Sequence, residues 1–109
     1  MAKRSDVVLA RVFFSDSPES KLRPCIVLSD ENYHNTGFVL LSPITTADDE
    51  YCIHIEKKDV DCELSSDSGA HFDMIVKSPG EQIVKKMGKV TPMFYDKLVA
   101  RIIGTIKSK

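Results

Sequence analysis

The sequence predicts a mainly β domain of the α+β class: a small barrel of five to seven short strands with a C-terminal α-helix. Three observations lead to this fold class. Short apolar runs alternate with polar segments rich in Gly, Pro, Ser, Asn and Asp, which is the pattern of strands joined by turns. Residues 91–107 repeat apolar side chains every four positions, as a helix facing a core does. The chain has 109 residues and 42% apolar content, which fits one domain, 1–109.

The first two strands are separated by a polar loop. Residues 1–5 read as a polar tail, and Asp6 to Phe14 is rich in Val, Leu and Phe with one arginine, which favours a strand. Residues 15–22, SDSPESKL, contain no apolar side chain before the last position and are predicted to be a loop. Arg23-Pro24 then opens a second strand through Leu28, since proline is tolerated where a strand starts.

The centre of the chain supplies the third strand. Residues 29–37 are turn-rich, and one helical turn there can be capped by Ser29 or Asp30. Residues 38–42, FVLLS, form the predicted third strand, and residues 47–50, ADDE, an acidic loop.

Two further strands follow with alternating patterns. Residues 51–56, YCIHIE, place Tyr, Ile and Ile on one face and Cys, His and Glu on the other, so His54 is expected to face outward. Ser68 to Val76 is predicted as the fifth strand, with Ala70 and Phe72 inward, and residues 77–81, KSPGE, as a turn.

The last strand and the helix complete the fold. Ile83 and Val84 indicate a short strand, and Gly88 a bend or bulge. Thr91 is a good N-cap and Pro92 suits the first helical position. The helix is expected to present four apolar side chains at a spacing of four: Phe94, Leu98, Ile102 and Ile106.

Several classes of protein are disfavoured. Cys25, Cys52 and Cys62 form no CxxC pair, which argues against a disulfide framework or a zinc site, and all three are predicted to be structural. The chain lacks Gly-rich phosphate loops, GxSxG and HExxH, so nucleotide-dependent and zinc enzymes are not expected. No run approaches the ~18 apolar residues of a membrane span, and the first residues resemble no signal peptide. A soluble, cytoplasmic protein without metal or cofactor is expected.

The net charge of −1 conceals a segregated distribution. Residues 1–29 carry five basic and three acidic groups, residues 30–73 two basic and eleven acidic groups, and residues 74–109 eight basic and two acidic groups. Such segregation is compatible with a basic face for a polyanion, and equally with an ordinary solvated surface.

The most promising polar residues stand at strand ends. Arg23 precedes one apolar run, and Thr45 follows another in LSPITT. If these strands are neighbours, Arg23 and Thr45 approach each other at the mouth of the barrel. Glu19 in the loop and the pair His71 and Asp73 are the other candidates.

Four segments carry a resemblance to the MazF/PemK (Kid) toxin family: SDVVLARVFFSD, KLRPCIVLS, LLSPITT and KKMGKVTPMFYDKLVARI. The resemblance spans residues 6 to about 106. It implies an SH3-like barrel of the CcdB/PemK type, a homodimer, and a metal-independent endoribonuclease that cleaves single-stranded RNA (mRNA) and is blocked by an antitoxin protein. The motif arginine and threonine fall on Arg23 and Thr45. The Arg-x-Asp of relatives reads His71-Phe72-Asp73 here, and the Gly-x-Glu-Gln-x-Gly loop is replaced by residues 17–21, SPESK.

The resemblance implies roles for these residues. Arg23 stabilises the charge of the pentavalent phosphorane, because its planar guanidinium matches phosphate oxygens. Thr45 donates a hydrogen bond to the same phosphate, Glu19 or His71 takes the proton of the 2′-OH, and Asp73 accompanies His71. RNA binding is assigned to four residues: Lys21, Thr46, Lys85 and Lys86.

Two alternatives remain open. One is a toxin of the CcdB type, which would act by binding gyrase and would not need Arg23 or Thr45. The other is an inactive relative that only binds nucleic acid or a partner, as the changed loop and His71 allow.

Overall fold

The computed structural model describes residues 2–13, 19–46 and 50–107 and contains seven strands and two α-helices. The strands are β1 (Asp6–Phe13), β2 (Ser20–Val27), β3 (Phe38–Thr45), β4 (Cys52–His54), β5 (Gly69–His71), β6 (Val76–Pro79) and β7 (Ile83–Lys89). The helices are α1 (Glu31–His34) and α2 (Pro92–Ile106), and two single 3-10 turns are η1 (Lys57–Asp59) and η2 (Gly80–Gln82).

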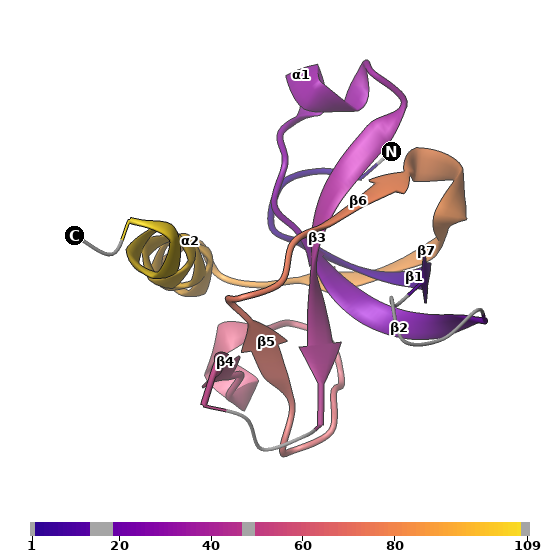
Figure 1. Cartoon of the computed structure of the whole chain (residues 1–109). Helices are drawn as coiled ribbons and strands as arrows, with labels where there is room; N and C mark the ends of the chain where they lie inside the picture. The colour runs from indigo at the N-terminus through magenta and orange to yellow at the C-terminus, as the bar shows by residue number, and fades with distance from the viewer. Residues whose placement is uncertain (1, 14–18, 47–49, 108–109) are drawn as a thin grey trace.

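The strands form one bent antiparallel sheet in the order β4-β5-β3-β2-β1-β7, with β6 also paired to β3. Figure 1 shows β3 running through the middle of the molecule. One end of β3 pairs with β6 and the other with β5. Among the described strands, no pairing joins β7 to β4 or β6, so the sheet does not close. The fold is a sheet-dominated α+β domain of the predicted class rather than a closed barrel.

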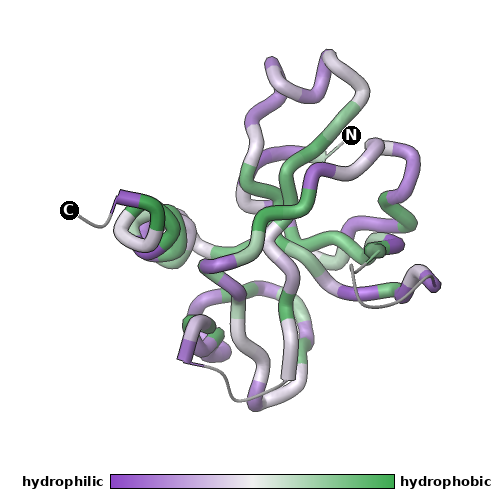
Figure 2. Tube along the Cα trace, in the orientation of Figure 1, coloured by the Kyte–Doolittle hydropathy of each residue, from purple (hydrophilic) through white to green (hydrophobic). Residues whose placement is uncertain are grey.

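Each face of the sheet carries its own apolar core. The alternation of strand side chains divides β1 between the two, with Val7 in one cluster and Val8 in the other. The first cluster lies under α2 and includes Ile26, Ile44, Phe94, Leu98 and Ile102. The second is built from strands alone and includes Val12, Cys25, Val39 and Leu41. In Figure 2 the hydrophobic colour concentrates where the strands cross and along one side of α2. Burial on both sides explains why the runs in β1 and β2 are continuously apolar.

The C-terminal helix forms as predicted. Thr91 is the N-cap, and its Oγ1 accepts a hydrogen bond from Phe94 N at 3.1 Å, while proline occupies the first turn. Phe94, Leu98 and Ile102 are buried, and each such side chain contributes roughly 1.5–3 kcal/mol of hydrophobic free energy. Ile106 is 70% exposed, so the predicted apolar face ends one turn early.

The predicted fifth strand is wrong as a single element. It separates into β5 and β6, because the two halves pair with opposite ends of β3. Both halves are antiparallel to β3, but residues 72–75 between them lie outside the strands, and Phe72 N donates to Tyr51 O at 3.0 Å. The predicted turn at 77–81 is therefore partly strand, followed by η2.

The ends of several strands also differ from the predicted ones. β2 begins at Ser20, inside the predicted loop, and β3 continues to Thr45. β4 is only three residues long, whereas β7 extends to seven, with a register shift opposite Gly88 as expected of a bulge. Asp30 caps α1 by accepting from Tyr33 N at 3.0 Å. Parts of the predicted loops at 15–22 and 47–50 lie outside the described residues.

The predicted N-terminal tail is attached to the fold from residue 2. Ser5 N donates to Val27 O at 2.9 Å, and the carbonyl of Ala2 is 3.1 Å from His34 Nδ1. Within the described ranges, the molecule has no helix of the length and apolarity that crossing a membrane requires.

Candidate active site

Arg23 and Thr45 meet at one edge of the sheet. β2 and β3 are antiparallel, with Cys25 opposite Pro43. Arg23 lies two residues before Cys25, and Thr45 lies two residues after Pro43, so this register places them opposite each other. Their side chains are on the same face of the sheet as those of Cys25 and Pro43, because side chains alternate with a period of two. Both are half-buried, and both line a cavity of about 410 Å³. The predicted neighbourhood of these two residues is present.

Two of the four predicted RNA-binding residues line the same cavity. Lys21 lies two positions before Arg23 on β2, so it shares its face of the strand. Thr46 follows Thr45 and is exposed. The other wall of the cavity comes from four residues between β4 and β5: Glu63, Leu64, Ser65 and Ser68.

Sequence reasoning missed Glu63, Ser65 and Ser68. The segment 57–67 reads as a charged connection, and no spacing within it distinguishes one carboxylate from another. Only the fold brings Glu63 against the ends of β2 and β3. Leu64 is the one available signal, since it packs against the apolar cluster under α2 and so fixes its neighbours on the rim.

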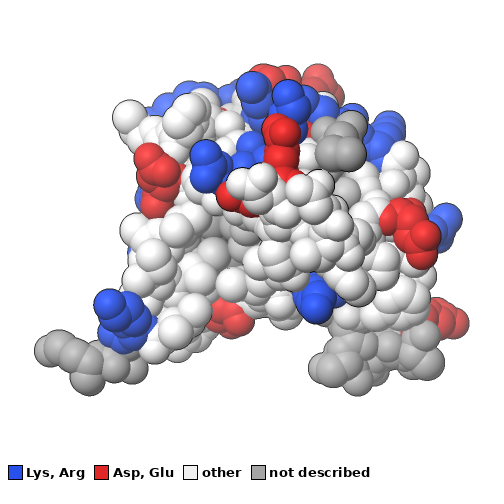
Figure 3. All heavy atoms as spheres, turned by 90° about the horizontal axis from the view of Figure 1, so that it is seen from above, with Lys and Arg blue, Asp and Glu red and all other residues white. Residues whose placement is uncertain are grey.

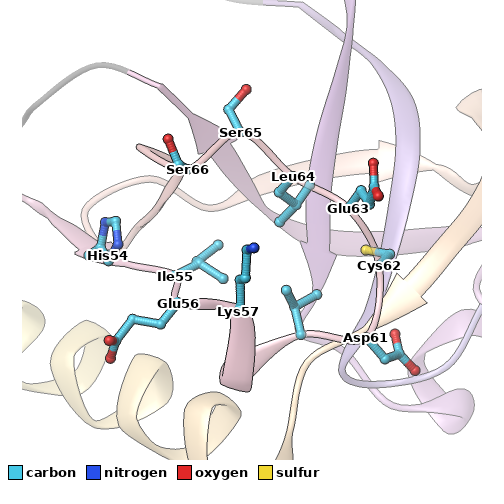
Figure 4. Close-up of a pocket in the computed structure, with 11 residues that line it drawn as sticks. His54, Ile55, Glu56, Lys57, Asp61, Cys62, Glu63, Leu64, Ser65 and Ser66 are labelled. Atoms are coloured by element: carbon cyan, nitrogen blue, oxygen red, sulfur yellow. The ribbon is translucent and has the colours of Figure 1, made fainter.

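A larger cavity of about 930 Å³ adjoins the first and shares Glu63, Leu64 and Ser65 with it. Figure 4 shows the segment 54–66 curving around this space, with the amino group of Lys57 directed into it. His54, exposed as predicted, stands at the rim. Residues 63–65 thus form part of the lining of both cavities.

His71 and Asp73 are placed elsewhere. His71 Nδ1 lies 3.3 Å from Asp73 Oδ1 and 3.5 Å from Cys52 Sγ. Neither His71 nor Asp73 is among the described residues that line the cavity of Arg23 and Thr45. The predicted pair exists as a contact, but its nearest reactive neighbour is a thiol.

Glu19, Lys85 and Lys86 are also outside the described lining of this cavity. Glu19 is exposed and directly precedes β2. Lys85 is exposed on β7. Lys86 Nζ lies 3.3 Å from Asp6 Oδ1, whose side chain is 3% exposed, so this lysine neutralises a buried carboxylate.

Basic and acidic side chains are interspersed on the face drawn in Figure 3. In Figure 3 the Lys and Arg side chains are mixed with Asp and Glu, and the centre of that face is uncharged. The charge of Arg23 acts on a buried neighbour: burial raises the pKa of the Cys25 thiol to about 12, and the Arg23 charge acts in the opposite direction. Within the described ranges, no three His, Cys, Asp or Glu side chains are grouped to bind a metal.

The arrangement suits a phosphate group. A guanidinium supplies a planar pair of donors, Thr45 and Ser65 supply hydroxyls, and Glu63 supplies a carboxylate on the opposite wall. A cation that stabilises negative charge and a carboxylate that accepts a proton are groups that a phosphoryl-transfer reaction can use.

Solved structures share the fold across nearly the full chain. A Mycobacterium tuberculosis toxin, MazF-mt6, is 19% identical with a TM-score of 0.70, covering 92% of this chain and 93% of that one. A MazE–MazF structure from Deinococcus radiodurans is 12% identical with a TM-score of 0.77, covering 96% and 95%. A mycobacterial endoribonuclease in complex with its cognate antitoxin is 18% identical with a TM-score of 0.68, covering 95% and 90%.

Sequence comparison gives the family. No curated protein sequence matches the chain. A family sequence model does match, over residues 3–105, and it describes the PemK-like, MazF-like toxins of type II toxin–antitoxin systems. The match covers all seven strands and α1, and it covers α2 except for its last residue. The chain therefore belongs to the PemK-like, MazF-like toxin family.

Proposed function

We propose that this toxin is a metal-independent endoribonuclease that cleaves single-stranded RNA in the cytoplasm at the edge formed by Arg23 and Thr45. The observation that carries the proposal is the cavity itself, which both residues line together with Lys21 and Glu63. The family match and the similar fold of a protein described as an endoribonuclease support it.

RNA supplies its own nucleophile, the 2′-OH next to the scissile phosphate. The oxygen of that hydroxyl forms a bond to phosphorus, and the bond to the leaving 5′ oxygen breaks. Arg23 stabilises the additional negative charge of the phosphorane, and Thr45 donates a hydrogen bond to the same phosphate. A cyclic 2′,3′-phosphate and a 5′-OH are the products, and a proton must leave the 2′-OH and reach the 5′ oxygen.

Glu63 is the base that the cavity favours. It is exposed and lines the cavity opposite Arg23, so its carboxylate can accept a proton from a hydroxyl held between them. Glu19 and His71, the residues predicted from sequence, lie outside the described lining of that cavity. Lys21 and Thr46 contact the RNA backbone at the entrance, and the affinity that the charge of Lys21 contributes falls as the salt concentration rises.

Substitution of four residues tests these roles. Arg23→Ala should lower cleavage by at least about 100-fold, the usual loss for a donor that stabilises transition-state charge. Glu63→Gln should lower it by about 100-fold or more, and Glu19→Gln much less. Arg11→Ala is the matched control, because Arg11 is an exposed arginine one strand away whose side chain alternates to the other face. Its activity should equal that of the unmodified protein.

The result also separates the alternatives. If Arg23→Ala cleaves as well as Arg11→Ala, the site assignment is wrong. If neither the parent nor any variant cleaves RNA while the parent still inhibits growth, a gyrase-directed or other binding toxin replaces the ribonuclease. If the parent neither cleaves nor inhibits growth, the chain is an inactive relative.

We further propose a homodimer and an antitoxin partner. Four exposed apolar side chains of α2 and β7 are available for an interface: Met93, Ile103, Ile106 and Val84. Structures of similar fold are described as complexes with MazE or with a cognate antitoxin. Light scattering at low micromolar concentration should give about twice the 12.2 kDa chain mass. A species of the single-chain mass would contradict the dimer.

A further inference from the structure

The cavity of about 930 Å³ beside the proposed cleavage site contains one lysine amino group. Figure 4 shows the side chain of Lys57 directed into this cavity, toward the space that Ile55 and Leu64 also face. Lys57 forms no ion pair with a described residue. The next residue differs: Lys58 Nζ lies 3.8 Å from Glu56 Oε2, and Lys58 is not among the described residues that line the cavity. Two consecutive lysines therefore have different surroundings.

The backbone that carries Lys57 is fixed on both sides. On its N-terminal side, Ile55 N donates to Ser68 O at 2.9 Å. On its C-terminal side, Thr91 N donates to Asp59 O, also at 2.9 Å. Because this backbone is already ordered, a ligand of Lys57 loses less affinity to the ordering of the protein.

The charges around the cavity disfavour a phosphate group as its occupant. Three carboxylates belong to the described lining, those of Glu56, Asp61 and Glu63, against the one amino group of Lys57. A phosphate would add a negative charge beside three like charges, which repel it. A neutral nucleobase avoids this repulsion, and its rings can pack on apolar side chains. Three apolar residues of the lining are available: Ile55, Val60 and Leu64.

The cavity is also placed to receive a base of the RNA. Residues 63–65 line both this cavity and the one that contains Arg23 and Thr45. Bases of single-stranded RNA can be splayed out of the strand and bound by their edges. A nucleotide that flanks the phosphate at Arg23 can therefore direct its base toward Lys57.

The amino group of Lys57 distinguishes the bases by their acceptors, since it carries three donors and no acceptor. Guanine presents N7 and O6 side by side, and lysine commonly binds this edge. Adenine presents N7 beside the N6 amino group, whose hydrogens face the donors of lysine unfavourably. Cytosine presents an amino group as well, and uracil presents O4 without a neighbouring N7. Guanine therefore matches Lys57 best.

We propose that Lys57 is a specificity-determining residue that binds the O6 and N7 edge of a guanine base next to the scissile phosphate. The inference rests on the proposed function, in which single-stranded RNA binds at Arg23 and Thr45. It adds contact with a base to the backbone contacts proposed for Lys21 and Thr46.

The test is the affinity for short 2′-O-methyl oligouridylates that contain one guanosine or, in the counterpart, one adenosine. The methyl group blocks the 2′-OH, so fluorescence anisotropy measures binding without cleavage. A good lysine contact with this edge discriminates between bases by roughly 5- to 150-fold. Because Lys57 is exposed, we expect the lower end of this range. The parent should bind the guanosine oligonucleotide about 5- to 10-fold more tightly than the adenosine one.

Two variants and a modified base identify the contact. Lys57→Met keeps a side chain of similar length without donors, and it should bind both oligonucleotides equally. Lys58→Met is the matched control, because it removes the same charge from the adjacent residue and should keep the preference for guanosine. An oligonucleotide with 7-deazaguanosine lacks the N7 acceptor. The parent should bind it more weakly than the guanosine oligonucleotide, and Lys57→Met should not distinguish the two.

A preference for guanosine that is lost in Lys57→Met and kept in Lys58→Met supports the proposal. Equal binding of the guanosine and adenosine oligonucleotides by the parent overturns it, as does a preference that survives Lys57→Met. Failure of the proposed function gives a different result. If the parent leaves ordinary RNA intact while its preference for guanosine depends on Lys57, the base contact stands and the ribonuclease assignment fails. Cleavage of ordinary RNA without that preference keeps the ribonuclease and overturns the base contact.

Discussion

Gly88 occupies a position in β7 where no side chain fits. A Cβ added there would overlap Asp61 Oδ1, and it would lie 2.7 Å from Cys62 Cβ and 3.0 Å from Cys62 Sγ. Asp61 cannot simply move away, because its Oδ1 accepts a hydrogen bond from Lys89 N at 2.7 Å. Gly88→Ala therefore forces the connection after η1 away from β7.

The magnitude follows from the two contacts. Overpacking of this kind costs about 1–3 kcal/mol, and loss of a hydrogen bond to a charged group about 1.5–3 kcal/mol when buried. Because Asp61 is exposed, the second term falls to about 1 kcal/mol, the typical net value of a hydrogen bond, and we expect a loss of about 2–4 kcal/mol in the free energy of unfolding. For a domain of this size that lowers Tm by roughly 10–20 °C.

Gly104→Ala is the matched control. Gly104 lies in α2, and nothing lies within 4 Å of an added Cβ. The same substitution there should stabilise the protein by about 0.5–1 kcal/mol, because alanine is the better helix former. Urea denaturation of both variants measures the difference. If Gly88→Ala lies within about 0.5 kcal/mol of the parent, as harmless surface substitutions do, the packing described for β7 is wrong.

Two further predictions concern α2. Thr91→Ala removes the acceptor for Phe94 N and should cost about 1 kcal/mol in urea denaturation; an unchanged denaturation midpoint would contradict the cap. Tyr95→Phe removes the hydroxyl that donates to Leu28 O at 2.6 Å. Burial raises the pKa of Tyr95, with a smaller opposing effect of Arg4. The protonated hydroxyl therefore contributes its full stabilisation below about pH 10, and this contribution is lost as the pH rises through the pKa of the folded state. The parent should therefore lose more stability than Tyr95→Phe between neutral pH and about pH 11, and parallel losses would refute this.

The fold was predictable wherever one local rule acted alone. Thr91 and Pro92 define the start of α2 because capping and a fixed φ angle depend only on neighbouring residues. The apolar runs of β1 and β2 were recognisable because burial on both faces leaves little room for polar side chains. Arg23 and Thr45 were brought together correctly by the inference that their strands are neighbours.

The rest depends on pairings that no local pattern contains. Residues 68–76 read as one strand because the alternation continues through Phe72, yet β5 and β6 pair with opposite ends of β3. Glu63 reached the cavity through the packing of Leu64, which a sequence of charged residues does not reveal. Contacts between distant segments decided each of these cases.

The most direct test of the ribonuclease site is incubation of the purified protein with mixed-sequence single-stranded RNA in EDTA, followed by analysis of the product ends. Attack by the 2′-OH predicts cleavage without metal that leaves a 2′,3′-cyclic phosphate and a 5′-OH. Intact RNA with folded protein, cleavage that EDTA abolishes, or products with a 5′-phosphate would each contradict the mechanism assigned to Arg23 and Thr45.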